Sequence, residues 1–252
     1  MQVSYSRVGT FLSCPYKWKL MYKDGLTTLP TDDPQSPLVL GHALHTGIEK
    51  DVRTAIQEYF FAYPIIDDRH INESIKLENL IPKVKAIIPE GFHEVKLECD
   101  DFIGFIDLLA PVDDDTFDIY DFKYSNNVAH YMESGQLHVY KYFFELLNPG
   151  KCIRNLYFLF IPKTMIRQKK TEDLYQFRQR LLETLDSMYP EIKQVKYQSA
   201  KVMEFLLDTK HMVECEDFHK NPTRLCDFCE FKQYCESNGE IDWMLEPKGG
   251  RR

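Results

Sequence analysis

Several features that mark other classes of protein are missing from this 252-residue sequence. It has no run of about 18 apolar residues, which a membrane-spanning helix requires. Its start, MQVSYSRVGTFLSC, lacks the basic segment and apolar stretch of a secretory signal. Neither an internal repeat nor a low-complexity tract is present. We therefore expect a globular cytoplasmic protein that does not associate with membranes.

An excess of positive charge is also missing, because 39 acidic residues outnumber 31 basic ones and the net charge is −8. This balance argues against a protein that coats nucleic acid through its overall charge. Local basic clusters remain, and each is either a solvated surface or part of a groove for a polyanion. These clusters contain Lys17, Lys19 and Lys23 near the start, and Lys163, Arg167, Lys169 and Lys170 in the second half.

The seven cysteines are an odd number, and three of them crowd into the segment CDFCEFKQYC at 226–235. In a reducing compartment such a cluster is typical of metal ligands rather than disulfides. Cys226, Cys229 and Cys235 have the spacing C-x2-C-x5-C, which leaves a four-ligand site one ligand short. Cys99, Cys152 and Cys215 have no partners at metal-binding spacing. The seventh cysteine, Cys14, is considered below.

Apolar residues at helical spacing predict helices before residue 93 and again between 131 and 213. Ser6 is the expected N-cap of the first helix, and Pro82 and Pro89 are expected to break the third. The polar, proline-rich segment 27–37 and the tail after Trp243 are expected to be irregular and mobile. The predicted helices cover 4–25, 39–62, 66–90, 131–147, 172–189 and 198–213.

Alternating, β-branched and aromatic residues over 93–125 predict three strands, with turns near 100–101 and 111–116. A further buried strand is predicted over 153–161, where the sequence is IRNLYFLFI. The order of helices, hairpins, helix, strand and helix indicates an α/β fold. We expect a mixed sheet rather than a doubly wound parallel one.

The second predicted hairpin brings polar groups together. If its turn centres near Asp114, residues whose numbers sum to about 228 face each other, as Asp107 and Asp121 do. Lys123 lies two residues beyond Asp121 and shares its face. Opposed carboxylates stay ionised most easily around a divalent cation, and the lysine can position water or offset charge on a phosphate. The alternative is a solvent-facing hairpin with an ordinary salt bridge.

These residues resemble the motifs of the RecB-like branch of the PD-(D/E)XK nucleases. Gly104–Asp107 matches G-x-x-D, and Asp121–Lys123 matches D-x-K. Upstream, Gly41–His45 is similar to the G-x-x-x-H of that branch, and downstream Gln136–Tyr140 is similar to its Q-x-x-x-Y helix. The resemblance implies a restriction-endonuclease-like core, in which a central mixed sheet is flanked by helices.

The resemblance also implies roles for single residues. Lys123 would position the attacking water, and Gln136 and Tyr140 would orient Lys123 or the scissile phosphate. Taken alone, however, a histidine is often structural, and a Gln–Tyr pair is ordinary on an amphipathic helix. A histidine ligand favours Mn²⁺ mildly over Mg²⁺. The implied metal ligands are His45, Asp107, Asp121 and the backbone carbonyl of Phe122, with Glu94 as an additional ligand and Glu98 as its rival.

The resemblance to iron–sulfur members of this branch suggests which cysteine is the missing fourth ligand. The segment SYSRVGTFLSCPYKWKLMY at 4–22 resembles their N-terminal helix, in which a cysteine precedes proline, as Cys14 does. The implied cofactor is a [4Fe–4S] cluster, with tetrahedral zinc as the alternative. We expect one nuclease domain over 1–252, with an iron–sulfur subdomain from 4–25 and 215–240 and a catalytic core over 39–213. The implied cluster ligands are Cys14, Cys226, Cys229 and Cys235.

The function implied by the resemblance is metal-dependent exonuclease cleavage of DNA, on single strands or single-stranded ends. Endonuclease or flap cleavage is an additional activity that the resemblance allows. Its setting would be recombination, repair or CRISPR adaptation in a bacterial, archaeal or phage-infected cell. Candidate partners are DNA, a second copy of the chain, or a recombination or CRISPR protein. No G-x-x-x-x-G-K-[ST] motor motif is present. The alternative is a non-catalytic subunit that binds DNA ends. Tyr16, Trp18 and Tyr22 would stack on bases or pack beneath the cluster.

Overall fold

The computed structural model describes residues 2–29 and 32–248. The chain divides into two compact units. The smaller unit comprises 1–31, 98–104 and 199–252, and the larger unit comprises 32–97 and 105–198. Both ends of the chain therefore contribute to the smaller unit, and the larger unit is built from the middle of the sequence. Among the described residues, no helix has the length and apolar character needed to cross a membrane.

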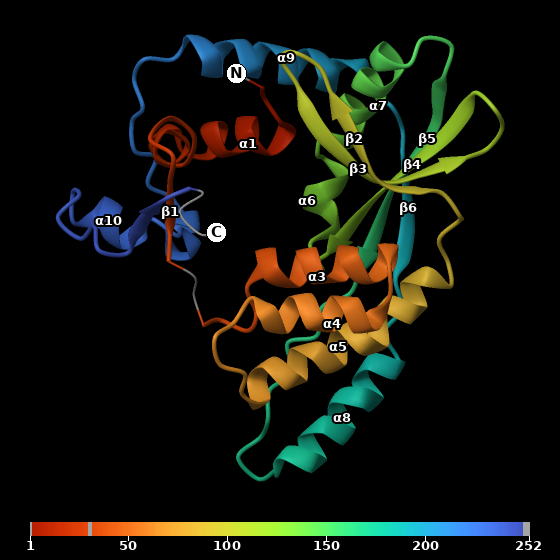
Figure 1. The fold of residues 1–252 in the computed structure, drawn as a ribbon, viewed down its shortest axis with the longest axis vertical. Helices are drawn as coiled ribbons and strands as arrows, with labels where there is room; N and C mark the ends of the chain where they lie inside the picture. The colour runs from red at the N-terminus through yellow and green to blue at the C-terminus, as the bar shows by residue number, and fades with distance from the viewer. Residues whose placement is uncertain (1, 30–31, 249–252) are drawn as a thin grey trace. The chain divides into compact units, whose positions relative to one another are not determined.

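A five-stranded mixed sheet, ordered β2-β3-β4-β5-β6, forms the framework of the larger unit (Figure 1). The β3–β4 and β5–β6 pairs are antiparallel, whereas β4 and β5 run parallel. The mixed sheet and its first four strands confirm the sequence prediction. β6 was not predicted, because its sequence EIKQV is short and mostly polar. The strands are β2 (Phe92–Glu98), β3 (Ile103–Pro111), β4 (Thr116–Tyr124), β5 (Cys152–Ile161) and β6 (Glu191–Val195).

Helices flank this sheet in the larger unit. Side chains of β4 alternate in direction. Phe122 joins a core formed with α3, α4, α5 and α8, while Phe117 packs on Phe144 of α7 with ring centroids 5.6 Å apart. Each side of the strand therefore has its own helical cover. The helices are α3 (Pro37–Glu49), α4 (Val52–Phe61), α5 (Asp68–Lys85), α6 (Val128–Met132), α7 (Gln136–Leu147) and α8 (Leu174–Asp186).

Three predicted helices in this unit differ from the structure. The stretch 131–147 is not one helix, because it covers the end of α6, a turn at 133–135 and then α7. The stretch 39–62 is not one helix, because the Asp51 side chain accepts the Thr54 N–H at 2.9 Å and begins a second helix, α4. The stretch 66–90 is not broken at Pro82, which lies inside α5. That helix ends at Lys85, so Pro82 lies in its last turn, where it removes one backbone N–H without breaking the helix.

The first predicted helix of the smaller unit is also divided. Its N-cap is Ser4 rather than Ser6, because the Ser4 hydroxyl accepts the Arg7 N–H. Cys14 has an extended backbone, with φ −160° and ψ 105°, because the following residue is proline. The segment therefore forms α1 (Tyr5–Ser13), α2 (Pro15–Trp18) and the π-helix η1 (Lys19–Lys23).

The rest of the smaller unit comes mainly from the end of the chain. Trp18 is buried and stacks on Phe218, with ring centroids 5.6 Å apart, so it packs in this unit and does not offer a face to nucleobases. The tail after Trp243 is not wholly irregular, since β7 pairs antiparallel with β1. The elements are β1 (Leu26–Thr28), α9 (Ser199–Glu214), η2 (Arg224–Phe228), α10 (Lys232–Glu236) and β7 (Leu245–Pro247).

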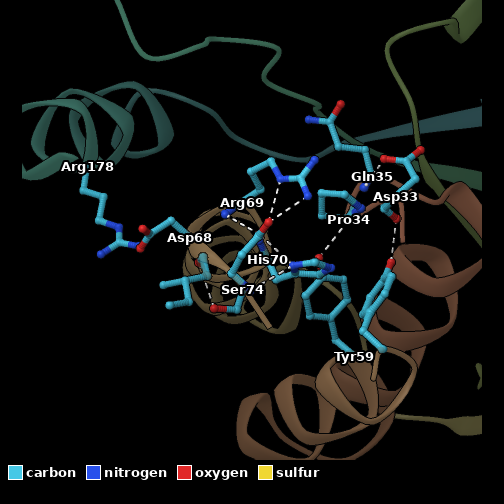
Figure 2. A network of polar contacts seen from close by, with 12 residues as sticks. Asp33, Pro34, Gln35, Tyr59, Asp68, Arg69, His70, Ser74 and Arg178 are labelled. Atoms are coloured by element: carbon cyan, nitrogen blue, oxygen red, sulfur yellow. Dashed lines mark hydrogen bonds and ion pairs between the residues drawn. The ribbon is translucent and has the colours of Figure 1, made fainter. Parts of the chain in front are cut away.

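The start of the larger unit is anchored rather than loose. Figure 2 shows Tyr59 directed toward Pro34, whose carbonyl accepts the Tyr59 hydroxyl at 2.8 Å. The Tyr63 hydroxyl donates to the Asp33 carbonyl at 2.8 Å, and the Gln35 amide donates to Glu73 at 2.9 Å. The part of the proline-rich segment over 33–35 is therefore fixed on α4 and α5, contrary to the expected mobility. Residues 30–31 of that segment lie outside the described residues.

Candidate active site

The β3–β4 hairpin has the register that the sequence predicts. Leu108 faces Tyr120 and Leu109 faces Ile119, so the paired numbers sum to 228. Asp107 and Asp121 are the next residues of the two strands beyond the Leu108–Tyr120 pair, and both are buried. Asp107 Oδ2 accepts the Phe122 backbone N–H at 2.6 Å. The hairpin therefore fixes Asp107 beside the strand that carries Asp121.

Three candidate metal ligands meet at this hairpin. His45 comes from α3, Glu94 from β2 and Asp107 from β3, and their ligand atoms all lie within 4.8 Å of one another. His45 Nδ1 is 3.4 Å from Glu94 Oε1 and 3.6 Å from Asp107 Oδ1. Within 2–29 and 32–248, this is the only group of three or more such residues that meets this distance limit. Glu98, the alternative to Glu94 as the additional metal ligand, instead accepts a hydrogen bond from the Gln2 side chain at 3.1 Å.

Glu94 has a strained backbone, with φ of 50°. This left-handed region is unfavourable for a residue with a Cβ, and such conformations cost of order 1–3 kcal/mol. The strain lies at the one residue of β2 that joins the metal-ligand group. Strained residues cluster at functional sites, where the surrounding fold holds a side chain in a required position.

The electrostatics of this group favour a cation. Burial, followed by the nearby Asp121, raises the pKa of Asp107 to about 7. Burial alone would lower the pKa of His45, but Asp107, Glu94 and Asp121 outweigh burial and raise it to about 9. The hydrogen bond from His45 is the main reason that the pKa of Glu94 is lowered. The metal-free site therefore retains protons that a divalent ion would displace.

Lys123 is linked to the acidic pair and to α7. Its Nζ lies 2.5 Å from Asp121 Oδ2 and donates to Gln136 Oε1 at 3.0 Å. Gln136 Nε2 in turn donates to the Tyr140 hydroxyl at 3.0 Å. Burial lowers the pKa of Lys123, but Asp121 and Asp107 outweigh burial and the net shift is upward, so the side chain stays an ammonium.

A divalent cation fits this donor set. Asp121 Oδ1 is buried, and no described residue donates a hydrogen bond to it. An unsatisfied buried carboxylate oxygen is costly unless a cation or water approaches it. Carboxylate oxygens with one imidazole nitrogen are ligands that suit Mn²⁺ and Mg²⁺. The structure thus brings His45, Glu94, Asp107, Asp121, Lys123, Gln136 and Tyr140 into one connected group.

Sequence analysis missed two aromatic residues at this group. The Tyr131 ring centroid lies 5.3 Å from Lys123 Nζ, and the Phe158 ring centroid lies 5.8 Å from it. Phe158 faces Asp121 in the parallel β4–β5 register, which single-sequence periodicity cannot reveal. Tyr131 follows Lys123 by eight residues in a different element, so no helical or strand repeat relates the two.

The basic cluster of 163–170 is only partly solvated. Lys163 is half-buried, its Nζ lies 4.8 Å from the Tyr124 ring centroid, and burial lowers its pKa. Arg167, Lys169 and Lys170 are exposed, and of these Lys169 pairs with Glu172 at 3.9 Å. Two of the four cations therefore remain the better candidates for contact with a polyanion.

Four cysteines line one cavity of about 870 Å³ within the smaller unit. Cys14 Sγ accepts the Lys17 N–H at 3.5 Å, and Cys226 Sγ accepts the Thr223 N–H at 3.4 Å. None of the seven cysteines, all within the described residues, forms a disulfide. The cysteines that line the cavity are Cys14, Cys226, Cys229 and Cys235.

Comparison with known proteins defines the class. Residues 2–236 match the PD-(D/E)XK nuclease superfamily, and the chain belongs to that superfamily. A solved structure of a candidate exonuclease from Eubacterium rectale has a TM-score of 0.45 and 13% identity, covering 90% of this chain and 92% of that one. A solved structure of a protein called SSO0001 has a TM-score of 0.40 and 12% identity, covering 94% and 86%. No curated protein matches the chain.

Proposed function

We propose that this member of the PD-(D/E)XK nuclease superfamily is a metal-dependent DNA exonuclease of the RecB-like branch. The observation that carries the proposal is the approach of His45, Glu94 and Asp107 to one another beside the Asp121–Lys123 pair. An acidic pair on adjacent strands, with a lysine that remains charged, suits hydrolysis of an anionic phosphodiester. Single-stranded DNA, or DNA with single-stranded ends, is the proposed substrate.

The proposed metal ligands are His45, Glu94, Asp107, Asp121 and the backbone carbonyl of Phe122. A bound Mn²⁺ or Mg²⁺ would supply Lewis-acid polarisation of the phosphate and a lowered pKa for the attacking water. The hydrogen bond from the Phe122 N–H to Asp107 Oδ2 keeps one oxygen of that carboxylate occupied, and Oδ1 is the atom that approaches His45. Asp107 can therefore present Oδ1 to a cation without losing its backbone contact.

Lys123 acts as a cation and a hydrogen-bond donor in this proposal rather than as a base. Its raised pKa keeps the proton on Nζ at neutral pH, so the ammonium can orient water and offset negative charge that develops on the phosphate. Asp121 Oδ2 pairs with the ammonium at 2.5 Å, and Gln136 Oε1 accepts a hydrogen bond from it at 3.0 Å. Tyr140 holds the amide of Gln136 and thereby its orientation.

We also propose a [4Fe–4S] cluster bound by Cys14, Cys226, Cys229 and Cys235. Support comes from the shared cavity that these four thiols line and from the backbone N–H groups that two of their sulfurs accept. Such hydrogen bonds to sulfur are a common feature of iron–sulfur sites. Zinc is the alternative, and it requires four thiolates about 2.3 Å from one ion. Iron, sulfide and zinc analysis of anaerobically purified protein separates the two.

The proposed setting is DNA recombination, repair or CRISPR adaptation in the cytoplasm of a bacterial, archaeal or phage-infected cell. A second copy of the chain or a recombination or CRISPR protein would be the partner. Arg167 and Lys170 are exposed and would attract the phosphate backbone, which makes DNA binding sensitive to salt.

The test is degradation of end-labelled DNA in Mn²⁺ by wild type, Asp121→Asn and Asp114→Asn. Both substitutions remove one carboxylate from the same hairpin, but Asp114 lies exposed in its turn. We expect Asp121→Asn to lower the rate by on the order of 100-fold or more, and Asp114→Asn to match wild type.

Equal cleavage by wild type and Asp121→Asn would show that the catalytic assignment is wrong. DNA binding without cleavage by any of the three proteins would favour a non-catalytic subunit that holds DNA ends.

A further inference from the structure

The ammonium of Lys123 lies against two aromatic rings that belong to none of the nuclease motifs. The ring centroids of Tyr131 and Phe158 are 5.3 Å and 5.8 Å from Nζ. Both distances fall within the range in which a cation is attracted to an aromatic face. The Lys123 side chain is only 16% exposed, so this attraction acts where water screens it little.

The position of the Tyr131 ring is set by the sheet. Its centroid lies 6.3 Å from that of Phe158 and 6.1 Å from that of Phe160, both on β5. The chain that leads from β4 to α6 is tied to the end of β5 by Asn126. The amide of Asn126 donates to the Lys163 carbonyl at 2.8 Å and accepts the Lys163 N–H at 2.8 Å. Tyr131 is therefore held against β5.

The same connection continues to Gln136. The Ser134 N–H donates to the Tyr131 carbonyl at 2.9 Å, and the Gln136 N–H donates to the Ser134 hydroxyl at 3.2 Å. Tyr131 and Gln136 thus reach Lys123 from one short stretch between β4 and α7. The ring contacts the ammonium through its face, and the amide accepts a hydrogen bond from it.

The donors of Lys123 are not exhausted by these contacts. An ammonium has three N–H groups. Gln136 accepts one of them, the ion pair with Asp121 at 2.5 Å engages at most one more, and an aromatic face attracts the charge without requiring a directed N–H bond. The third N–H is thereby left for a water molecule or a phosphate oxygen. A polar side chain in place of the ring would compete for that N–H.

We propose that Tyr131 is a positioning residue, whose ring face holds the Lys123 ammonium at the acidic pair while leaving one N–H for the substrate. This inference rests on the proposed nuclease function. Phe158 shares the contact but is fully buried, so its replacement would disturb the core. Tyr131 is only partly buried, which makes it the residue to test.

The experiment compares Tyr131→Leu with Tyr131→Phe in the Mn²⁺-dependent assay. We expect Tyr131→Leu to lower kcat about 10-fold with KM for DNA changed less than about 2-fold, because the lost attraction acts on the reacting group. Tyr131→Phe keeps the ring and should retain at least about half of the wild-type kcat. Tyr175→Leu, at a 72% exposed tyrosine of α8, is the matched control.

Calorimetric titration with Mn²⁺ and thermal unfolding complete the test. The proposal requires near-wild-type metal affinity and melting temperature in Tyr131→Leu. Full activity of Tyr131→Leu would overturn it, and so would equal impairment of Tyr131→Phe, or a loss of metal affinity or folding that accounts for the fall in kcat. Asp121→Asn in the same assay separates the two proposals. If Asp121→Asn is inactive and Tyr131→Leu is fully active, only the inference about Tyr131 fails, whereas an active Asp121→Asn refutes the nuclease site itself.

Discussion

Asp107 is a carboxyl group held where ionisation is unfavourable in the metal-free protein. It is buried beside Asp121, and its pKa of about 7 lies well above its ordinary value of 3.8. The folded protein therefore retains a proton that the unfolded chain releases between pH 4 and pH 7. Over that interval this group makes the folded state progressively less stable as the pH rises. A bound cation would reverse the effect, since it favours the charged form.

Asp107→Asn tests this account. The amide oxygen can still accept the Phe122 N–H, and no charge develops beside Asp121. In EDTA we expect the variant to match wild type near pH 4 and to exceed it by about 1–3 kcal/mol at pH 7 to 8. Mn²⁺ should raise the melting temperature of wild type but not of the variant. Denaturant unfolding at several pH values measures both effects, and a stability difference that stays constant with pH would contradict the explanation.

At the scale of elements, α8 is attached to α5 at both of its ends. Figure 2 shows Arg178 of α8 reaching Asp68, which it contacts at 2.9 Å, and Arg178 also donates to Asn72 at 3.0 Å. At the other end, Lys83 Nζ donates to the carbonyls of Leu185 at 2.6 Å and Met188 at 3.0 Å. A basic side chain that donates to carbonyls at the end of a helix caps it, so Lys83 caps α8, where the Leu185 carbonyl also accepts the Met188 N–H at 3.0 Å.

Lys83→Met should therefore destabilise the larger unit while keeping most of the aliphatic packing. Loss of the charge-assisted bonds from the Lys83 ammonium to these carbonyls is expected to cost about 1–3 kcal/mol. Lys196→Met, at an exposed lysine beyond β6, is the matched control and should be nearly neutral. Urea denaturation compares the two, and equal stability of both variants would show that the cap contributes little.

Sequence alone predicted the β3–β4 hairpin well, because alternation and the turn residues fix its register and hence the approach of Asp107 to Asp121. It failed where a single side chain decides a boundary. The Asp51 cap divides the helix over 39–62, and β6 has too few apolar residues to stand out. At the site, motif residues were identifiable, whereas Tyr131 was not, since a ring over a cation depends on tertiary packing.

At the scale of the whole molecule, the proposed cluster would join residue 14 to 226–235 within the smaller unit. By analogy with a disulfide, closing so long a loop removes about 4–5 kcal/mol of conformational entropy from the unfolded chain. The gain applies only when the metal cofactor is present, because four protonated thiols provide no covalent link. Loss of the cofactor should therefore weaken the unit that contains both ends of the chain.

Cys14→Ser tests this role, with Cys152→Ser as the control. Cys152 is exposed at the start of β5 and does not line the cavity. We expect Cys14→Ser to lose most iron, sulfide and visible absorption and to unfold several degrees below wild type, while Cys152→Ser keeps its iron and its melting temperature. Full iron content in Cys14→Ser would remove Cys14 from the ligand set.

The division of the chain has a practical consequence. Only residues 98–104, near the tip of the β2–β3 hairpin, interrupt the larger unit, which otherwise runs from 32 to 198. His45, Glu94, Asp107, Asp121 and Lys123 all fall inside that span. Exchanging the tip for a tight two-residue turn would yield a contiguous minimal fragment without Cys14, Cys226, Cys229 or Cys235. Dissection of this kind offers a way to study the proposed phosphodiester hydrolysis apart from assembly of the proposed cluster.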